Sequence, residues 1–264
     1  MSNFNEELIS EINSLRTNPR IYARKILKYI KYFKGKLFCL SESDDAFQTE
    51  EGPDAFREAA DFLSKQSRLE PLKPSKGLCR IAEDFISVVQ NDSNVLEVRN
   101  MEEIINKYGE FNGVFSNVMD FGGKTPEQAI IFSIVNDGDK SREQRESLLS
   151  SEIKSIGVAN GEHKIYRHCT SIVVCTIFEN TYDYDDNGLL KKNVDDNEKR
   201  RNKYQKRDKY YEKGKEELPK GVASLDKIEE VIMENGLKKK ITKIIKVMKD
   251  GSIQIETTKK VLNE

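Results

Sequence analysis

Apolar residues recur three or four positions apart in four segments near the start of the chain. This spacing predicts amphipathic helices, each with one buried face. Their apolar positions are Leu8, Ile12 and Leu15; Tyr22, Ile26 and Ile30; Phe56, Ala59, Ala60 and Leu63; and Leu78, Ala82, Phe85 and Val89. This part of the chain is therefore predicted to be mainly helical.

Several helix starts can be placed from residues that suit a first helical turn. Asn18 can cap exposed N–H groups, and Pro19 and Pro53 fit the first helical position. Two further starts have the spacing of a capping box: Thr125 with Gln128, and Ser141 with Gln144. The pattern thus predicts additional helices beginning near residues 126 and 142.

Beyond residue 150 the pattern becomes that of strands. Residues 171–178 form a nearly continuous apolar run rich in β-branched side chains, which is typical of a strand buried on both faces. Residues 155–159 fit a partner strand, with Asn160 and Gly161 as the turn. Helices followed by buried strands predict an α/β domain, residues 1–180, in which helices cover both sides of a sheet.

The last third of the chain has a different character. Residues 181–221 are polar and nearly free of aliphatic side chains, which predicts a charged linker. Within residues 222–264 we expect a short helix, capped by Ser224 and carrying Leu225, Ile228, Val231 and Ile232. Two β-prone runs around Asp250 and Gly251 then predict a basic β-hairpin arm. An isolated hairpin is marginally stable in water, so this one is expected to dock on another surface, whether of this chain or of a partner.

Charge is unevenly distributed along the chain. The net charge is only −1, yet residues 1–190 are net acidic and residues 191–264 are net basic. A basic arm on an acidic body favours an acidic partner for the arm. The lysines predicted to contact that partner are Lys238, Lys239, Lys240, Lys243 and Lys246.

The cysteines and the N-terminal residues give an indication of the cellular compartment. The four cysteines form no Cys-x-x-Cys pair, which argues against a zinc ribbon or a thioredoxin-like motif. Cys169 and Cys175 are an even number of residues apart, so they should share one strand face as packed thiols. The N-terminus has no signal-peptide pattern, and no apolar run is long enough to span a membrane. We therefore expect a cytoplasmic protein without a transmembrane segment.

Six short segments and a cysteine follow one another in a characteristic order: residues 8–19, 72–82, 115–127, 142–149, 156–159 and 163–166, followed by Cys169. Taken in this order, they resemble the CAP superfamily (cysteine-rich secretory proteins, antigen 5 and pathogenesis-related 1; the SCP domain). They span roughly residues 5–180. The resemblance implies an α-β-α sandwich, in agreement with the helix and strand patterns.

Members of this superfamily often hold two histidines and two glutamates in a central cleft, where some bind a divalent metal. At the matching positions this chain has Phe85 and Gln144 for the histidines and Asn117 for one glutamate. The other glutamate falls near Val135, and only the neighbouring Arg145 matches the family. The resemblance therefore implies a degenerate member whose cleft has lost its metal ligands.

The chemistry of these side chains leads to the same expectation without the family. Phenylalanine and valine have no atom that can ligate a metal cation, and neutral amides are poor ligands for Zn²⁺. The chain has only two histidines, His163 and His168, and we expect His163 to be a hydrogen-bonded or surface residue. Arg145 should pair with a neighbouring acid. No cofactor is predicted.

One other segment has part of a metal-binding pattern. Asp183, Asp185 and Asn187 match the first half of a calcium loop, but Val194 stands where a bidentate glutamate belongs. An acidic turn is the favoured interpretation of this segment.

These patterns favour a non-catalytic interaction or structural protein, attached through its basic arm to a larger, acidic assembly. Tubulin or a ciliary complex would provide such a surface, in a ciliary or cytoskeletal setting. The alternatives are a lipid- or sterol-binding module, since the resemblance implies such activity for some members, and a hydrolase with a non-standard site. Nucleic-acid binding is not favoured, because acids are mixed with the lysines and tyrosines near Tyr204.

Overall fold

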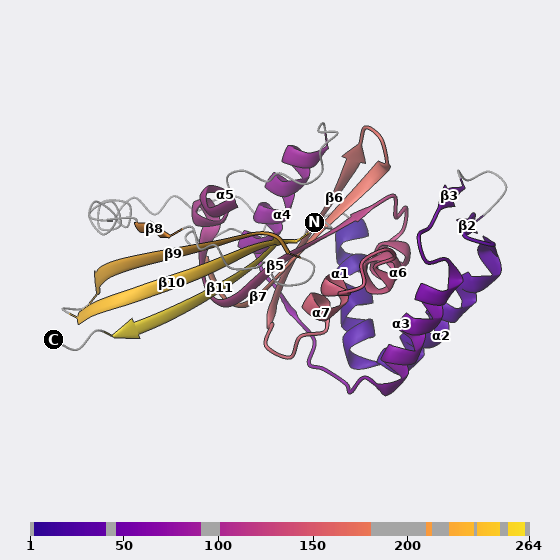
Figure 1. Cartoon of the computed structure of the whole chain (residues 1–264), viewed down its shortest axis with the longest axis horizontal. Helices are drawn as coiled ribbons and strands as arrows, with labels where there is room; N and C mark the ends of the chain where they lie inside the picture. The colour runs from indigo at the N-terminus through magenta and orange to yellow at the C-terminus, as the bar shows by residue number, and fades with distance from the viewer. Residues whose placement is uncertain are drawn as a thin grey trace.

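The computed structural model describes residues 3–40, 46–90, 101–180, 210–212, 222–234, 237–248 and 253–261 (Figure 1). Its helices are α1 (Asn3–Thr17), α2 (Pro19–Tyr29), the 3-10 turn η1 (Ile30–Tyr32), α3 (Pro53–Lys65), α4 (Lys76–Val89), α5 (Met101–Tyr108), α6 (Pro126–Val135) and α7 (Glu143–Leu148). Its strands are β1 (Phe33–Lys34), β2 (Leu37–Phe38), β3 (Phe47–Gln48), β4 (Lys73–Pro74), β5 (Gly109–Phe121), β6 (Ser155–His163), β7 (Arg167–Asn180), β8 (Tyr210–Glu212), β9 (Val222–Glu234), β10 (Leu237–Met248) and β11 (Ile253–Val261).

The main sheet is mixed and has the strand order β4-β6-β7-β5-β11-β10-β9-β8. The short β4 pairs parallel to β6, and the remaining neighbours pair antiparallel. The described part of the chain is therefore of the predicted α/β class.

Helices lie on both faces of this sheet, as predicted. Along β7, Ile172 and Val174 face a cluster formed with α1, α3 and α6, whereas Val173 and Cys175 face a second cluster formed with α4 and α5. Figure 1 shows α1, α6 and α7 on one side of the sheet and α4 and α5 on the other. The apolar run in β7 is thus buried on both faces, which confirms the prediction from its β-branched composition.

Most predicted helix starts are confirmed. Pro19 and Pro53 occupy the first turns of α2 and α3, and the Thr125 hydroxyl accepts a hydrogen bond from the Gln128 N–H at 3.2 Å. Asn18 makes no side-chain cap. The second capping box is wrong, because the Ser141 hydroxyl donates to Asp139 and the residue before α7 is Arg142.

The prediction of a helix after residue 222 is wrong, because this segment forms β9. Apolar residues at 225, 228, 231 and 232 fit a helix in isolation. In the folded chain, β9 pairs with β10 from Leu237 opposite Glu234 to Val247 opposite Ser224. This long-range ladder overrides a weak local preference, and the β-branched residues of the segment suit a strand.

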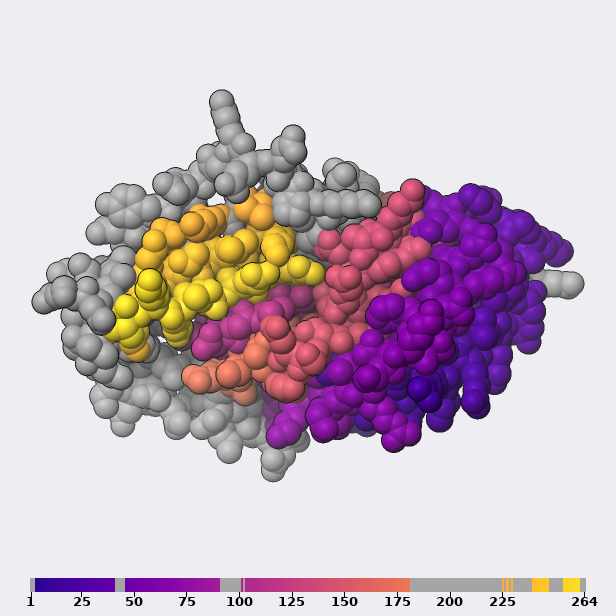
Figure 2. Space-filling view, turned by 60° about the horizontal axis from the view of Figure 1, so that its bottom comes forward, coloured from indigo at the N-terminus to yellow at the C-terminus, as the bar shows by residue number. Residues whose placement is uncertain are grey.

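The predicted C-terminal hairpin is confirmed, since β10 and β11 pair antiparallel along their length. Its turn residues Asp250 and Gly251 lie outside the described residues. The hairpin docks on the domain itself, with Ile255 of β11 opposite Phe115 of β5. Figure 2 shows the yellow C-terminal strands against the body of the molecule.

The sequence pattern missed or misplaced two features of the sheet. β5 was not predicted as a strand, although it lies between β7 and β11. The turn after β6 is not at Asn160 and Gly161, because β6 continues to His163 and pairs with β7 through His163 opposite Arg167. Polar residues within β5 and in the second half of β6 hide the β character of these segments from a search for apolar alternation.

A small sheet, β1-β2-β3, lies at the end of the molecule that carries α2 and α3 (Figure 1). Phe38 of β2 is fully buried there and contacts a set of aromatic rings. Its ring neighbours are Tyr29, Tyr32, Phe33, Phe47, Phe56 and Phe132. This cluster fixes β3 beside α6 and so builds one wall of a pocket.

Candidate functional site

The predicted cleft positions do not gather in one place. Phe85 of α4 is fully buried in the cluster on the α4 side of the sheet. Asn117 of β5 lies on that same face, between Phe115 and Met119, and its side-chain oxygen accepts a hydrogen bond from Ser171 at 2.7 Å. Gln144 lies on α7, which covers the opposite face. The sheet therefore separates Gln144 from Phe85 and Asn117, although the resemblance placed all three together.

Arg145 is a structural residue in this arrangement. Its side chain is 2% exposed, and two of its N–H groups bind the Glu58 carboxylate at 2.6 and 2.7 Å. A third N–H binds the Ile134 carbonyl at 2.6 Å. Arg145 holds the pKa of Glu58 below its ordinary value. The prediction that Arg145 pairs with a neighbouring acid is confirmed.

His163 closes the turn between β6 and β7. Its Nδ1 accepts hydrogen bonds from the N–H groups of Ile165 and Tyr166, both at 3.1 Å. Its ring also packs edge-on against Phe121. The side chain is buried, which confirms the hydrogen-bonded interpretation and excludes the surface one.

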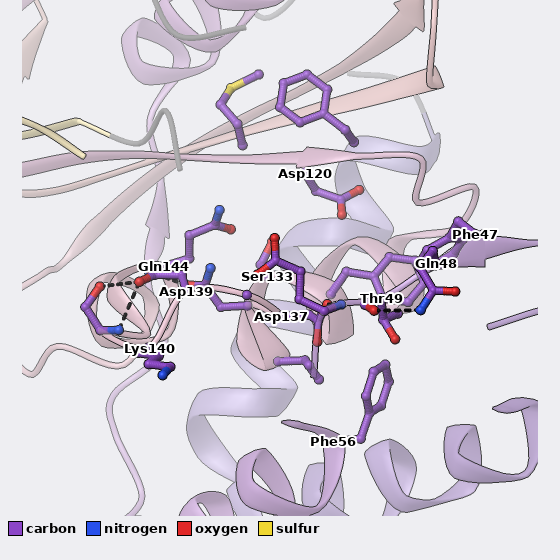
Figure 3. Close-up of a pocket in the computed structure, with 18 residues that line it drawn as sticks. Phe47, Gln48, Thr49, Phe56, Asp120, Ser133, Asp137, Asp139, Lys140 and Gln144 are labelled. Atoms are coloured by element: carbon purple, nitrogen blue, oxygen red, sulfur yellow. Dashed lines mark hydrogen bonds between the residues drawn. The ribbon is translucent and has the colours of Figure 1, made fainter. Parts of the chain in front are cut away.

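A pocket of about 650 Å³ lies beneath β5, between β3, α6 and the connection from α6 to α7 (Figure 3). One wall is aromatic and consists of Phe47, Phe56 and Phe132. The remaining walls are polar. Their charged side chains are Glu50, Asp120, Asp137, Asp139 and Lys140, and Gln144 provides a neutral amide. Acids therefore outnumber bases among the described residues that line this pocket.

Asp120 reaches the pocket because of its place near the end of β5. Strand alternation puts it on the same face as Val118, under α6, and Figure 3 shows it projecting from the strand toward Ser133. One carboxylate oxygen accepts a hydrogen bond from the Gly123 N–H at 3.1 Å. A Cβ on Gly123 would lie 2.4 Å from that oxygen, so the close approach requires glycine. Burial raises the pKa of Asp120 to about 7.

The mouth of the pocket is braced by contacts between two loops. Asp137 accepts hydrogen bonds from the backbone N–H groups of Glu50 and Glu51 at 2.6 and 2.9 Å. Arg142 binds both carboxylate oxygens of Glu51, at 2.7 and 2.8 Å, and lowers the pKa of that acid. The Asn136 side chain accepts from the Gln144 N–H at 3.0 Å. These bonds fix the position of Gln144 relative to the polar wall.

A second, more aromatic pocket of about 440 Å³ adjoins the first. The two pockets share Phe47, Gln48, Phe121 and Phe132. The second also contacts Phe38, Ile165 and Tyr166, from β2 and the β6–β7 turn. Lys124 and Arg167 also line the second pocket, so an acidic compartment lies beside one that is aromatic and basic.

Asp120 is the site residue that the sequence pattern missed. It stood inside a segment that resembles the CAP superfamily, but no role followed from its position because β5 was not predicted. The signal that could have found it is the Gly122-Gly123 pair directly after it, at which a chain can turn tightly around a buried carboxylate. Comparisons of the chain with protein-family models, curated proteins and solved structures found no match.

The predicted partner-binding lysines are divided between two faces of β10. Lys240 and Lys246 lie on one face, where they pair with Glu229 at 2.6 Å and Glu256 at 2.8 Å. Lys239 and Lys243 lie on the other face, and Lys238 is the second residue of the strand. The five lysines thus form no single-sided patch.

Strand pairing brings further lysines to the far end of the hairpin. Lys240 lies opposite Lys260, and Ile241 lies opposite Lys259. We call Lys239, Lys240, Lys259 and Lys260 the basic end. Figure 1 shows this end of β10 and β11 projecting away from α2 and α3.

Metal and redox chemistry find little support among the described residues. No group of three or more His, Cys, Asp or Glu side chains in this part of the chain could hold a metal ion. The calcium-loop candidates Asp183, Asp185 and Asn187 lie outside it. Cys169 and Cys175 are free and share the α4 face of β7, as predicted. Burial raises their pKa values to about 11 and about 12, which keeps both as thiols.

No helix within the described ranges is long and apolar enough to cross a bilayer.

Proposed function

We propose that this protein is a non-catalytic interaction protein that attaches to a larger, acidic assembly through its basic end. The observation that carries this proposal is the pairing of β11 with β5. Because Ile255 of β11 is fully buried in the core of the domain, the hairpin extends the sheet and is not a loose tail. The lysines are therefore presented in a fixed position relative to the body.

The charge of β10 and β11 supports an acidic partner. These two strands contain Lys238, Lys239, Lys240, Lys243, Lys246, Lys259 and Lys260, against Glu256 as their single acid. Lys259 and Lys260 are exposed, whereas Lys240 is partly neutralised by Glu229. An acidic protein surface such as that of tubulin or a ciliary complex, in the cytoplasm or the cytoskeleton, fits this charge.

The fate of the cleft positions supports a non-catalytic role. Arg145 and His163 are engaged in contacts that hold the fold, and Asn117 lies across the sheet from Gln144. The layered arrangement of helices on both faces of the sheet is compatible with the proposed membership of the CAP superfamily, as a degenerate member. A hydrolase gains less support, because the Ser133 hydroxyl in the pocket donates to the Ala129 carbonyl of its own helix.

Co-sedimentation with microtubules across a salt series tests the proposal. We expect the wild-type protein to bind at low salt and to dissociate as salt rises, because exposed charges are screened beyond about 8 Å at physiological ionic strength. The variant with Lys239, Lys240, Lys259 and Lys260 changed to glutamine should bind at least about tenfold more weakly. Deleting the hairpin is a poorer test, since it would remove Ile255 from the core.

A matched control changes four exposed lysines outside the hairpin, on α2, β1, α3 and β4, to glutamine: Lys28, Lys34, Lys65 and Lys73. It removes the same charge and should bind like the wild type. Equal binding by the basic-end variant and the wild type would reject the basic end as the anchor.

A second candidate function is a lipid- or sterol-binding module. The aromatic pocket of about 440 Å³, lined by Phe38, Phe121 and Tyr166, favours it, because apolar walls suit a lipid tail or a sterol ring. Liposome flotation with and without anionic lipid is the test. Recovery of the protein with floated vesicles would support this function. Its absence from the vesicle fraction both with and without anionic lipid would reject it.

A further inference from the structure

We propose that the pocket beneath β5 binds a small organic cation, namely an amine with an apolar body, whose ammonium group is held by Asp120. This inference concerns a different part of the molecule from the basic end and does not depend on the proposed function.

The Asp120 carboxylate is buried and has few hydrogen-bond partners. The residue is 5% exposed, lines the pocket, and receives one hydrogen bond, from the Gly123 N–H at 3.1 Å. Its other oxygen accepts no hydrogen bond from the residues that the structure describes, and the side chain projects to the pocket side of β5 (Figure 3). A buried carboxylate that lacks partners is destabilising, and a charge-assisted hydrogen bond from a cation would remove that penalty.

The walls around Asp120 carry a net negative charge among the described residues. Glu50, Asp137 and Asp139 also line the pocket, with Lys140 as the one cation among the lining residues that the structure describes. Asp137 and Asp139 already accept backbone N–H groups, so they hold the loop in place. Their negative charge still adds to the potential at Asp120, which disfavours anions and favours cations.

An apolar wall of aromatic rings lies in the same pocket as Asp120. Phe47, Phe56 and Phe132 can bury a hydrocarbon or aromatic body, and an ammonium group is attracted to the face of such a ring. Gln144 is 8% exposed and borders the same space, where its amide oxygen offers a second acceptor. The volume of about 650 Å³ lies in the range of small-ligand pockets. A bare metal ion would leave the aromatic wall unused.

The test uses the full-length protein and four probes in two matched pairs. The cations are 2-phenylethylammonium and hexylammonium, and the neutral counterparts are 2-phenylethanol and 1-hexanol. Binding is followed at pH 8 by calorimetry and by chemical-shift changes in protein NMR spectra. Asp120→Asn is the test variant. Asp61→Asn, which neutralises an exposed acid on α3 outside the pocket, is the control.

We expect at least one cation to bind more tightly than its neutral counterpart, with shifts at Asp120 and Gln144. Asp120→Asn should weaken that binding at least about tenfold, whereas Asp61→Asn should leave it unchanged. Thermal melting of both variants verifies that they are folded. Equal affinity for amine and alcohol, unchanged binding by Asp120→Asn, or no binding of either cation would overturn the proposal.

Discussion

The buried carboxyl group of Asp120 makes the stability of the folded protein depend on pH. Burial raises the pKa of Asp120 to about 7 in the folded protein, whereas the pKa of an aspartate in an unfolded chain is about 4. Between these values the unfolded chain has released a proton that the folded chain keeps. The contribution of Asp120 to the free energy of unfolding therefore falls as pH rises from about 4 to about 7.

Asp120→Asn removes this titration and keeps an oxygen that can accept from Gly123. We expect the variant to be more stable than the wild type above pH 7 and to differ little from it below pH 4. Chemical denaturation of both proteins at several pH values measures the difference, which cancels the other titrating groups. A difference that does not change with pH would contradict this assignment.

At Arg145 the expected effect is on the fold and not on a reaction. Arg145→Ala leaves the Ile134 carbonyl without its donor and removes the closer of the two arginines that pair with Glu58, the other being Arg142 at 3.3 Å. We expect a loss of about 3 kcal/mol in the free energy of unfolding, measured by urea denaturation. Glu58→Gln should have a smaller effect, about 1 kcal/mol or less, because that side chain is about half exposed. Equal effects of the two variants would contradict this explanation.

The junction between β11 and β5 is the element on which the proposed function depends. Ile255→Ala opens a cavity where β11 contributes to the core, so we expect a loss of about 2–5 kcal/mol. Hydrogen exchange should show weaker protection of β11 and of its neighbour β5. Val261→Ala, at an exposed position of the same strand, is the control and should have little effect. If Ile255→Ala is equally mild, the hairpin does not belong to the core.

Helices and their starts were the elements most accessible from sequence. Pro19, Pro53 and Thr125 each mark a helix start that the structure contains, because the preferences of a first helical turn depend on residues close in the chain. Ser141 was misleading, since its hydroxyl binds Asp139. A serine hydroxyl that lies close to several hydrogen-bonding groups can bind one of them and so not cap the helix.

Strands were less accessible, because their partners are distant in the chain. β5 contains Asn117 and Asp120, which are buried by long-range pairing with β7 and by the helices above them. The spacing of apolar residues in β9 fits a helix in isolation, and this segment forms a strand because it pairs with β10. The hairpin of β10 and β11 was predicted, because its two strands are adjacent in sequence and joined by a recognisable turn.

At the scale of the whole molecule, the two proposed binding regions lie at different ends. The basic end projects with β10 and β11, and the acidic pocket lies near β3 and α6 (Figure 1). A cationic ligand and an acidic partner are thus matched to separate regions of opposite charge. This division repeats the charge asymmetry of the sequence, in which residues 1–190 are net acidic and the remainder net basic.

The candidate site was only partly predictable, for a reason that belongs to this scale. The types of residue at Phe85, Asn117 and Gln144 already indicated a cleft without strong metal ligands. Their separation by the sheet could not be inferred, because it depends on the register of β5 and on the position of α7. Asp120 became a candidate only when its burial and its lone hydrogen bond were known.

The proposed role in binding, and not in metal-assisted chemistry, rests on the finding that no group of three or more His, Cys, Asp or Glu side chains among the described residues could hold a metal ion. The most direct measurement is the zinc content of the purified full-length protein after incubation with Zn²⁺ and extensive dialysis. We predict far less than one zinc ion per chain, and the same result for Gln144→Leu. One tightly held zinc ion per chain that is lost in Gln144→Leu would contradict the account.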